Sequence, residues 1–235
     1  MANIIRLGGG GGSQPVLITK SITQNGTYNA SSDNADGYSS VNVNVSGGGG
    51  SGTPFIFSTK LSNQGITLPV YGDDNYRYEF KLVIPCYQSE TLIFGGAWSV
   101  SSKLFHTFGS ASAPIIVYYI SNSYVSISYN YWDIMDIEAN TTYIKVDGTT
   151  YTGTATTKAH EQVSLYGLSG SHLAIIGISE MKIYDNSDDS LVMDLVPMKD
   201  SSTGDGYFHD TVGNTDYTSG VTGGLKYVEL TENSN

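Results

Sequence analysis

Apolar and polar residues alternate along much of this chain with a period of two, which predicts β-strands with one dry and one wet face. Residues 76–84 place Tyr, Tyr, Phe, Leu and Ile on one face and Arg77, Glu79 and Lys81 on the other. Residues 125–131 alternate in the same way, with Ser and Asn on the polar face. We expect further strands at Leu104–Phe108, Ile115–Ile120, Thr142–Val146, Ile175–Tyr184, Leu191–Leu195 and Leu225–Leu230.

The turn residues between these segments favour one fold class. Asp147-Gly148 stands between two short β-patterned runs, and this pair predicts a tight hairpin because both turn residues need positive φ. The pattern supports a helix only near Lys158–Ser164, over one or two turns. Ten or more short strands predict two packed sheets, since one open sheet would leave an apolar face bare. The expected class is therefore all-β, with a small N-terminal β module followed by a two-sheet antiparallel sandwich.

Two glycine runs, at residues 8–12 and 47–50, mark the expected boundaries within the chain. The second run leads into Ser, Gly and Thr, a composition typical of a flexible linker. The chain thus divides into four parts: an apolar anchoring tag that ends in the first glycine run (1–12), the small β module (13–46), the Gly-rich linker (47–54), and the sandwich with a C-terminal tail (55–235).

The small module is strongly β-patterned but too short to fold alone. Asn25-Gly26 is a strong hairpin signal, and Val41, Val43 and Val45 alternate with asparagines. Chains below about 40 residues seldom bury enough apolar surface without disulfides, metals or oligomerisation. The module has no Cys or His, so its apolar face needs another copy or another protein to cover it. We predict attachment and oligomerisation through Ile22, Tyr28, Tyr38, Val41, Val43 and Val45.

The composition excludes several kinds of partner. The net charge is −11, with only 11 Lys plus Arg, and these do not cluster. This charge disfavours nucleic acid, whose phosphates need clustered cations, and also an anionic membrane surface. No segment has the 18 or so apolar residues of a membrane-spanning helix. Cys86 is the one cysteine, which excludes an intramolecular disulfide, and its apolar neighbours predict a small core residue.

Two segments resemble parts of known proteins. Residues 22–45 read Ile-Thr-x-Asn-Gly-Thr-Tyr and then Asp-Gly-Tyr-Ser-Ser-Val-x-Val-x-Val. This pattern resembles a module of tail, baseplate and fibre proteins of bacteriophages of Firmicutes and gut bacteria, which also occurs in some surface proteins of those hosts. Residues 181–199 and 206–220 resemble the closing strands of concanavalin A-like (laminin-G-like) sandwiches of phage structural proteins. The resemblance narrows the expected sandwich to a jelly roll with two curved sheets.

The segment Trp132–Glu138 is the best candidate for catalysis. Jelly-roll glycosidases of the laminarinase type carry Glu-x-Asp-x-Glu on a strand, and retaining hydrolysis needs two carboxyls about 5–5.5 Å apart. Asp136 and Glu138 share a face because alternate strand residues do. The nucleophile position two residues before Asp136 is Ile134, and Asp133 points to the other face of a regular strand. The pattern therefore predicts a protein that is not an enzyme.

Metal and cofactor sites have weak support in the sequence. The four histidines lack metal-ligand spacing, and no Gly-x-Ser-x-Gly elbow is present. The acidic loop with Asp185, Asp188 and Asp189 has oxygen ligands that suit Ca²⁺, and so do residues 73–75. Laminin-G-like sandwiches, which this chain resembles, often bind calcium at the rim. Solvated turns explain such loops equally well, because Asp, Asn and Ser form turns themselves. We expect no cofactor, with calcium as the alternative.

Glycan binding is a further expectation, because aromatic side chains stack on sugar rings. We take Trp98, Tyr124, Tyr131 and Trp132 as candidate ligand-binding residues. Each of them also suits a sheet core or a cross-strand pair, so the sequence leaves both interpretations open.

The resemblance implies a non-enzymatic virion structural protein: a head fibre, decoration or tail-fibre subunit, assembled in the host cytoplasm. It further implies a homo-oligomer, a trimer as in fibres, whose N-terminus binds other virion proteins and whose sandwich contacts host-surface glycan or protein. A polysaccharide depolymerase or glycosidase on the same jelly roll is one alternative. A bacterial surface adhesin is another, disfavoured because the first residues lack the apolar stretch of a secretory signal.

Overall fold

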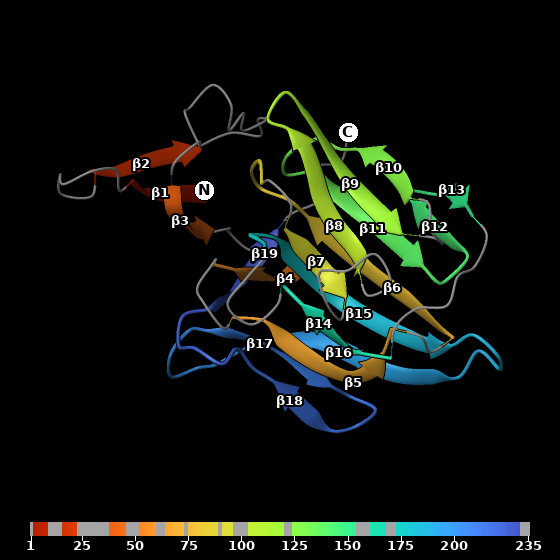
Figure 1. Ribbon diagram of the computed structural model, residues 1–235. Coiled ribbons are helices and arrows are strands. Elements are labelled where there is room, and N and C mark those ends of the chain that lie inside the picture. Colours follow the sequence, from red (N-terminus) through yellow and green to blue (C-terminus); the bar gives the residue numbers. More distant parts are fainter. Residues whose placement is uncertain are drawn as a thin grey trace.

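The strands of this protein form three sheets (Figure 1). The computed structural model describes residues 2–8, 16–22, 38–45, 52–59, 64–72, 75–88, 91–95, 103–119, 124–153, 160–167 and 173–230. These residues form nineteen strands and contain no helix. It follows that, in the part of the chain that is described, no helix has the length and hydropathy needed to span a bilayer.

Two of the sheets pack face to face as a sandwich, which confirms the predicted fold class. The smaller has six strands, in the order β10 (Tyr124–Ser128), β9 (Ala113–Tyr119), β8 (Lys103–Ser110), β7 (Leu92–Gly95), β14 (Gln162–Leu165) and β5 (Ile66–Tyr71). All of its pairings are antiparallel.

The larger sheet has ten strands and branches. Its main path is β13 (Thr149–Thr152), β12 (Tyr143–Val146), β11 (Ile134–Ala139), β6 (Tyr76–Val83), β15 (Gly177–Asp185), β16 (Leu191–Lys199), β17 (Gly206–Asp210) and β18 (Thr215–Tyr217). A side branch consists of β4 (Thr53–Ser58) and β19 (Leu225–Leu230). The branch arises at β15, whose first residues pair with β4 and whose later residues pair with β16.

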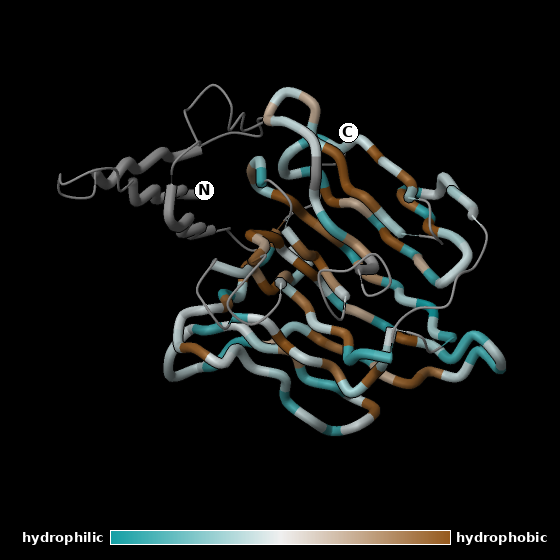
Figure 2. Tube along the Cα trace, viewed as in Figure 1, coloured by the Kyte–Doolittle hydropathy of each residue, from teal (hydrophilic) through white to brown (hydrophobic). Residues whose placement is uncertain are grey.

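The core lies between the two sheets. Apolar and polar residues alternate along the strands that enclose it (Figure 2). The ring of Phe80 on the larger sheet lies 5.7 Å from that of Phe94 and 6.4 Å from that of Phe105 on the smaller. The hydroxyl of Tyr118, which is buried, donates to the carbonyl of Asn140 at 2.6 Å. Burial of these aromatic rings supplies the main stabilising term for the sandwich.

The N-terminal sheet changes one predicted boundary. It has three strands in the order β2 (Val16–Ile22), β1 (Ala2–Gly8) and β3 (Tyr38–Val45), all antiparallel. The segment that we expected to be an anchoring tag, residues 1–12, thus contains the central strand of the module. β2 and β3 pair with β1 and not with each other. The predicted turn at Asn25-Gly26 lies outside the described residues.

Most predicted strands are confirmed, and the predicted helix is wrong where it is described. Residues 225–230 form β19 as expected, and alternate residues of β6 enter the core as expected. The Asp147-Gly148 hairpin is confirmed, with φ angles of 49° and 81°. Residues 162–164, the end of the expected helix, belong to strand β14 (Gln162–Leu165) instead. β14 pairs with β5 and β7, and these partners, remote in sequence, override the local pattern.

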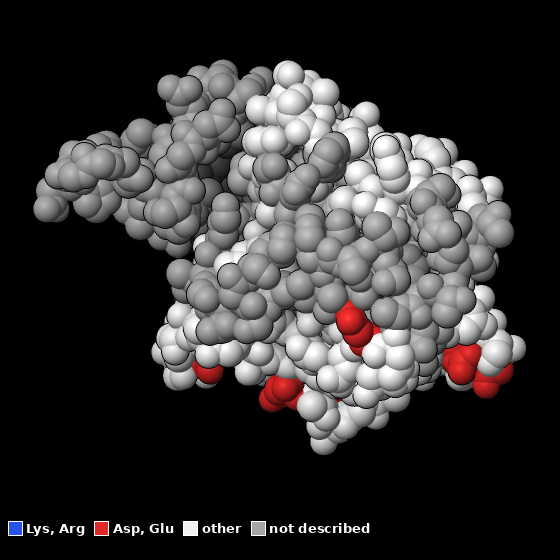
Figure 3. All heavy atoms as spheres, viewed as in Figure 1, with Lys and Arg blue, Asp and Glu red and all other residues white. Residues whose placement is uncertain are grey.

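The described surface of one face carries scattered acidic side chains and shows no Lys or Arg among the described atoms (Figure 3). This arrangement agrees with the net charge of −11. A surface of this kind repels polyanions at long range.

Candidate functional site

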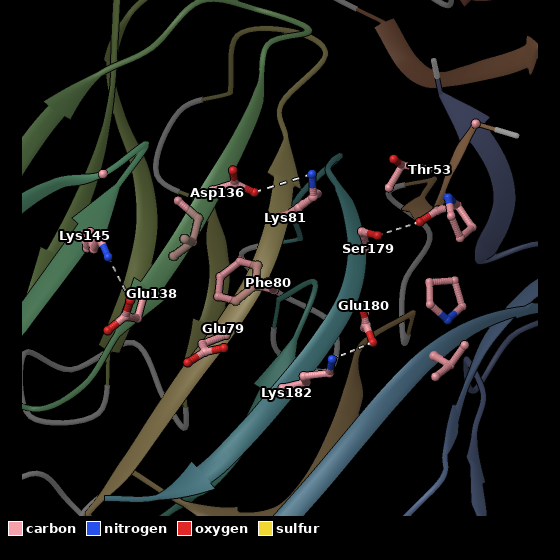
Figure 4. A pocket seen from close by; sticks show the side chains of 16 residues that line it. Thr53, Glu79, Phe80, Lys81, Asp136, Glu138, Lys145, Ser179, Glu180 and Lys182 are labelled. Carbon is pink, nitrogen blue, oxygen red and sulfur yellow. Dashed lines mark hydrogen bonds and ion pairs between the residues drawn. The ribbon is translucent and has the colours of Figure 1, made fainter. Parts of the chain in front are cut away.

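An open groove of about 910 Å³ crosses the outer face of the larger sheet. Its floor is formed by β12, β11, β6 and β15, and its far wall by the start of β4 and by β16 (Figure 4). The groove faces away from the core, because Phe80 and Ile137 on the same strands point inward. We call this feature the polar groove.

The polar groove is lined by charged residues from alternate strand positions. Strand register places Glu138 on β11 opposite Lys145 on β12 and opposite Glu79 on β6. Glu79 is in turn opposite Lys182 on β15. One row of four charged residues therefore crosses four neighbouring strands. Strands are about 4.8 Å apart, so each member of the row lies beside the next.

A second set of charged residues lies next to this row. Asp136 on β11 is opposite Lys81 on β6, and their side chains form an ion pair of 3.6 Å. Glu180 on β15 forms an ion pair of 3.0 Å with Lys182. Figure 4 shows both pairs on the groove surface.

Both carboxylate oxygens of Glu138 have a side-chain partner. Its Oε1 accepts a short hydrogen bond of 2.5 Å from the Tyr143 hydroxyl, and its Oε2 lies 3.3 Å from Lys145 Nζ. The hydrogen bond from Tyr143, followed by that from Lys145, holds the pKa of Glu138 below its usual value against a partial burial that raises it. Burial and the same hydrogen bond raise the pKa of Tyr143 to about 12. Glu138 is thus held as a carboxylate.

Glu79 is neutralised by a cation from its own strand. Arg77 Nε lies 2.8 Å from Glu79 Oε1, and Arg77 Nη1 lies 2.6 Å from Asp189 Oδ1. The guanidinium also lies over the ring of Tyr184, 4.4 Å from its centroid. Like charges directly opposite one another destabilise a sheet. Arg77 and Lys145 therefore compensate the facing carboxylates of Glu79 and Glu138.

A β-bulge in β15 shapes one end of the groove. The register with β6 shifts between Ile178 and Met181, both of which are buried in the core. The two residues between them consequently leave the regular alternation. Ser179 donates to the carbonyl of Pro54 at 2.8 Å and fastens β4 to β15, while Glu180 is exposed. The bulge thus holds the start of β4, which forms part of the groove wall, against β15.

The structure places the residues of the suspected glycosidase motif as the sequence predicted. Asp136 and Glu138 both face the groove, and Ile134 packs against an apolar cluster with Phe55 and Phe57. Asp133 lies in the preceding turn, where it accepts from Asn130 at 2.9 Å. The register reveals a facing carboxylate that the strand pattern alone did not, Glu79.

The three described aromatic residues among the four predicted to bind ligand do not form one site. Trp98 lies outside the described residues. Tyr124 is 63% exposed on β10, with Tyr119 as its aromatic neighbour at 6.1 Å. Tyr131 is buried and donates to Ala111, so it presents no ring face to a ligand, contrary to its predicted role.

Trp132 is partly buried rather than a free stacking surface. Its ring lies 6.1 Å from that of Phe57, in an apolar cluster on the opposite side of β4 from the main core. Its backbone is in the left-handed region, with φ of 70°, and its amide donates to the carbonyl of Ile84 at 3.0 Å. Packing and this hydrogen bond account for its position.

Each predicted calcium ligand already has a partner within the protein. Asp185 Oδ1 accepts from Ser187, and Asp188 Oδ1 accepts from Ser190 at 3.0 Å. The bonds from Ser190 lower the pKa of Asp188. Asp189 is bound to Arg77. Within the described ranges, no three His, Cys, Asp or Glu side chains converge to hold a metal ion, so the calcium prediction gains no support.

The predicted attachment residues fall on the N-terminal sheet where they are described. Ile22 is the last residue of β2, and Tyr38, Val41, Val43 and Val45 are on β3. Val43 is aligned with Ile4 of β1, and Val45 with Ala2. Tyr28 lies outside the described residues.

A scan against protein-family models and a search of curated proteins gave no match to this chain.

Proposed function

We propose that this chain is a non-enzymatic structural subunit of a bacteriophage particle: a head fibre, decoration or tail-fibre protein. The N-terminal module anchors it to other virion proteins and assembles it as a trimer. The sandwich is displayed outward and contacts glycan or protein on the host surface through the polar groove. The resemblance of residues 22–45, 181–199 and 206–220 to phage proteins motivates this proposal.

The observation that carries the binding role is the charge-paired surface of the polar groove. Its carboxylates lie beside cations, at 3.3 Å for Glu138 and Lys145 and at 3.0 Å for Glu180 and Lys182. A catalytic acid needs a raised pKa, whereas the pKa of Glu138 is lowered. The groove therefore suits ligand binding better than proton transfer.

The domain order suits attachment and display. The three-stranded sheet precedes the sandwich, and the two are separated by a run rich in glycine. Several copies tethered to one particle multiply weak single contacts into firm adhesion. The sandwich needs only modest affinity at each groove.

Immunogold labelling of phage particles tests the proposed location. Antibodies raised against the sandwich should label a fixed site on the particle, and added purified chain should slow adsorption of the phage to its host. Label on the bacterial envelope in place of the particle would support a surface adhesin. Absence of label on particles would contradict the proposal.

One observation favours the depolymerase as a second candidate. Glu79 on β6 is directly opposite Glu138 on the neighbouring strand β11, so two carboxylates project side by side from the groove floor, as the pair of a retaining glycosidase does. Purified protein incubated with host polysaccharide would then release reducing ends, and Glu138→Gln and Glu79→Gln would each abolish the release. Our proposal predicts no release from the unmodified chain.

A further inference from the structure

We propose that the polar groove selects uncharged, hydroxyl-rich saccharide chains over anionic polymers. This inference rests on the proposed function, in which the sandwich contacts the host surface. It names the chemical class of the ligand, which neither the fold nor the resemblance specifies.

The first step is the charge balance of the groove. Its acidic lining residues are Glu79, Asp136, Glu138 and Glu180, and its basic lining residues are Lys81, Lys145 and Lys182. Each of the three lysines lies within 3.6 Å of a carboxylate oxygen, and Arg77 beside the groove pairs with Glu79. Arg77 also pairs with Asp189, so the groove and these partners together hold five anions and four cations, and no cation lacks a carboxylate partner.

The second step is the cost of an anionic ligand. A phosphate, sulfate or carboxylate that approached Lys145 would lie next to Glu138, which is held as a carboxylate by Tyr143. The same repulsion holds at Lys182 beside Glu180 and at Lys81 beside Asp136. The overall charge of −11 adds long-range repulsion.

The third step is the fit of a hydroxyl group. A hydroxyl both donates and accepts, so it can accept from the ammonium and donate to the carboxylate of one pair. An ammonium has three donors and a carboxylate about four acceptor sites, so each pair retains capacity after its own contact is made. The partners are accessible, since Lys145 is 42% and Glu180 52% exposed.

The fourth step is the spacing of the pairs. The charged residues of the row stand on neighbouring strands about 4.8 Å apart, which is close to the length of one sugar ring. The row from Lys145 through Glu138 and Glu79 to Lys182 therefore offers repeated donor and acceptor sites to successive rings. The described residues that line the groove include no Tyr or Trp, so affinity depends on hydrogen bonds and multivalency rather than on stacking.

The test uses the full chain and two matched sets of probes. Neutral oligosaccharides of glucose, galactose and N-acetylglucosamine form one set, and oligogalacturonate and sulfated dextran oligosaccharides form the other. Saturation-transfer NMR and titration calorimetry should detect neutral saccharides at millimolar concentration and weak or no binding of the anionic set. Binding of only the anionic set, of peptides in place of saccharides, or of nothing would overturn the inference.

Two variants sharpen the test. Glu138→Gln leaves Lys145 without its carboxylate, so it should weaken neutral binding about tenfold and create salt-sensitive binding of the anionic set. Lys145→Gln should also weaken neutral binding but create no anion binding. Asp216→Asn, which removes an equal charge from a carboxylate that is hydrogen-bonded to His209 and is not part of the groove lining, is the control and should change neither. Anion binding that fails to appear in Glu138→Gln would contradict the inference.

The labelling and adsorption experiments test the proposed function independently of the saccharide class. Particles that are labelled by antibody and lose adsorption with added chain support the function whatever the saccharide class. If the chain is on the particle but prefers anionic polymers, the inference fails and the function stands.

Discussion

Tyr143 lies beside the polar groove and makes the shortest side-chain contact of Glu138. A hydrogen bond of 2.5 Å joins them, and Lys145 lies on the other carboxylate oxygen. These contacts lower the pKa of Glu138 and raise that of Tyr143. They fix the orientation of the central carboxylate before any ligand arrives, which reduces the entropy lost on binding.

Replacement of Tyr143 by Phe tests this coupling. A glutamate whose folded pKa is lowered stabilises the fold fully above its ordinary pKa, and that stability is lost as the pH falls through the lowered pKa. Tyr143→Phe should therefore cost about 1 kcal/mol at pH 7 and progressively less toward pH 3, as measured by urea unfolding.

A matched control is Tyr151→Phe on β13. Tyr151 is aligned with Ile144, and its ring packs toward the core instead of the groove. Its substitution should show no comparable pH dependence. An equal cost of Tyr143→Phe at both pH values would show that the hydroxyl does not act through the Glu138 carboxylate.

The sequence predicted part of the candidate site at this scale. Period-two alternation correctly placed Asp136 and Glu138 on one face and Arg77, Glu79 and Lys81 on another polar face. It could not show that these two faces are the same surface, because strand order and register depend on contacts remote in sequence. The burial of Tyr131 was likewise invisible, since Tyr suits a sheet core and a sheet surface alike.

Two elements with irregular geometry position the groove. The bulge in β15 diverts Ser179 toward Pro54, and the hairpin between β12 and β13 holds Lys145 and Gly148 at the groove edge. The hairpin was predictable because its signal lies in two adjacent residues. The bulge was not, since one extra residue looks the same as a continuous strand in the sequence.

Loss of the Ser179 hydroxyl should loosen the sheet branch. Ser179 is 2% exposed, and its bond to the Pro54 carbonyl connects β15 to β4. Ser179→Ala leaves a carbonyl without this donor and should lower the free energy of unfolding by about 1 kcal/mol in denaturant titrations. Ser187→Ala in the exposed β15–β16 turn serves as the control. If both variants cost the same, the Ser179 bond has no special role.

The hairpin makes an independent prediction about backbone strain. A Cβ at Gly148 would meet no atom within 4 Å, but φ is +81°, so only the backbone conformation opposes a side chain. Gly148→Ala should therefore cost about 1–2 kcal/mol, and Gly148→Asn less, because Asn tolerates the left-handed region. Thermal unfolding of the two variants measures this difference. A cost for Asn that matches or exceeds that for Ala would contradict the strain account.

The whole molecule combines a sandwich that has its own core with a sheet that is too small to stand alone. Two packed sheets were predictable from strand number, because only a sandwich covers that many half-apolar strands. The place of β1 at the centre of the N-terminal sheet was not, since the glycine run after Gly8 looked like a boundary. A short glycine-rich connection between paired strands gives the same composition as a linker.

Removal of residues 1–51 separates the two roles. The full chain should sediment as an oligomer, a trimer in our proposal, because three strands do not cover their own apolar face. The shortened chain should sediment as a folded monomer with a cooperative thermal transition, because its core lies between its own two sheets. Analytical ultracentrifugation distinguishes these states. A monomeric full chain at micromolar concentration would contradict the assembly role of the module.

The most direct test of the account is NMR mapping of host polysaccharide on the isotope-labelled chain, with polymer length followed in the same tube. The account predicts shifts at Glu138, Lys145 and Lys182 in the polar groove, and a polymer that keeps its length. Shifts confined to the smaller sheet around Tyr124, or steady shortening of the polymer, would contradict it.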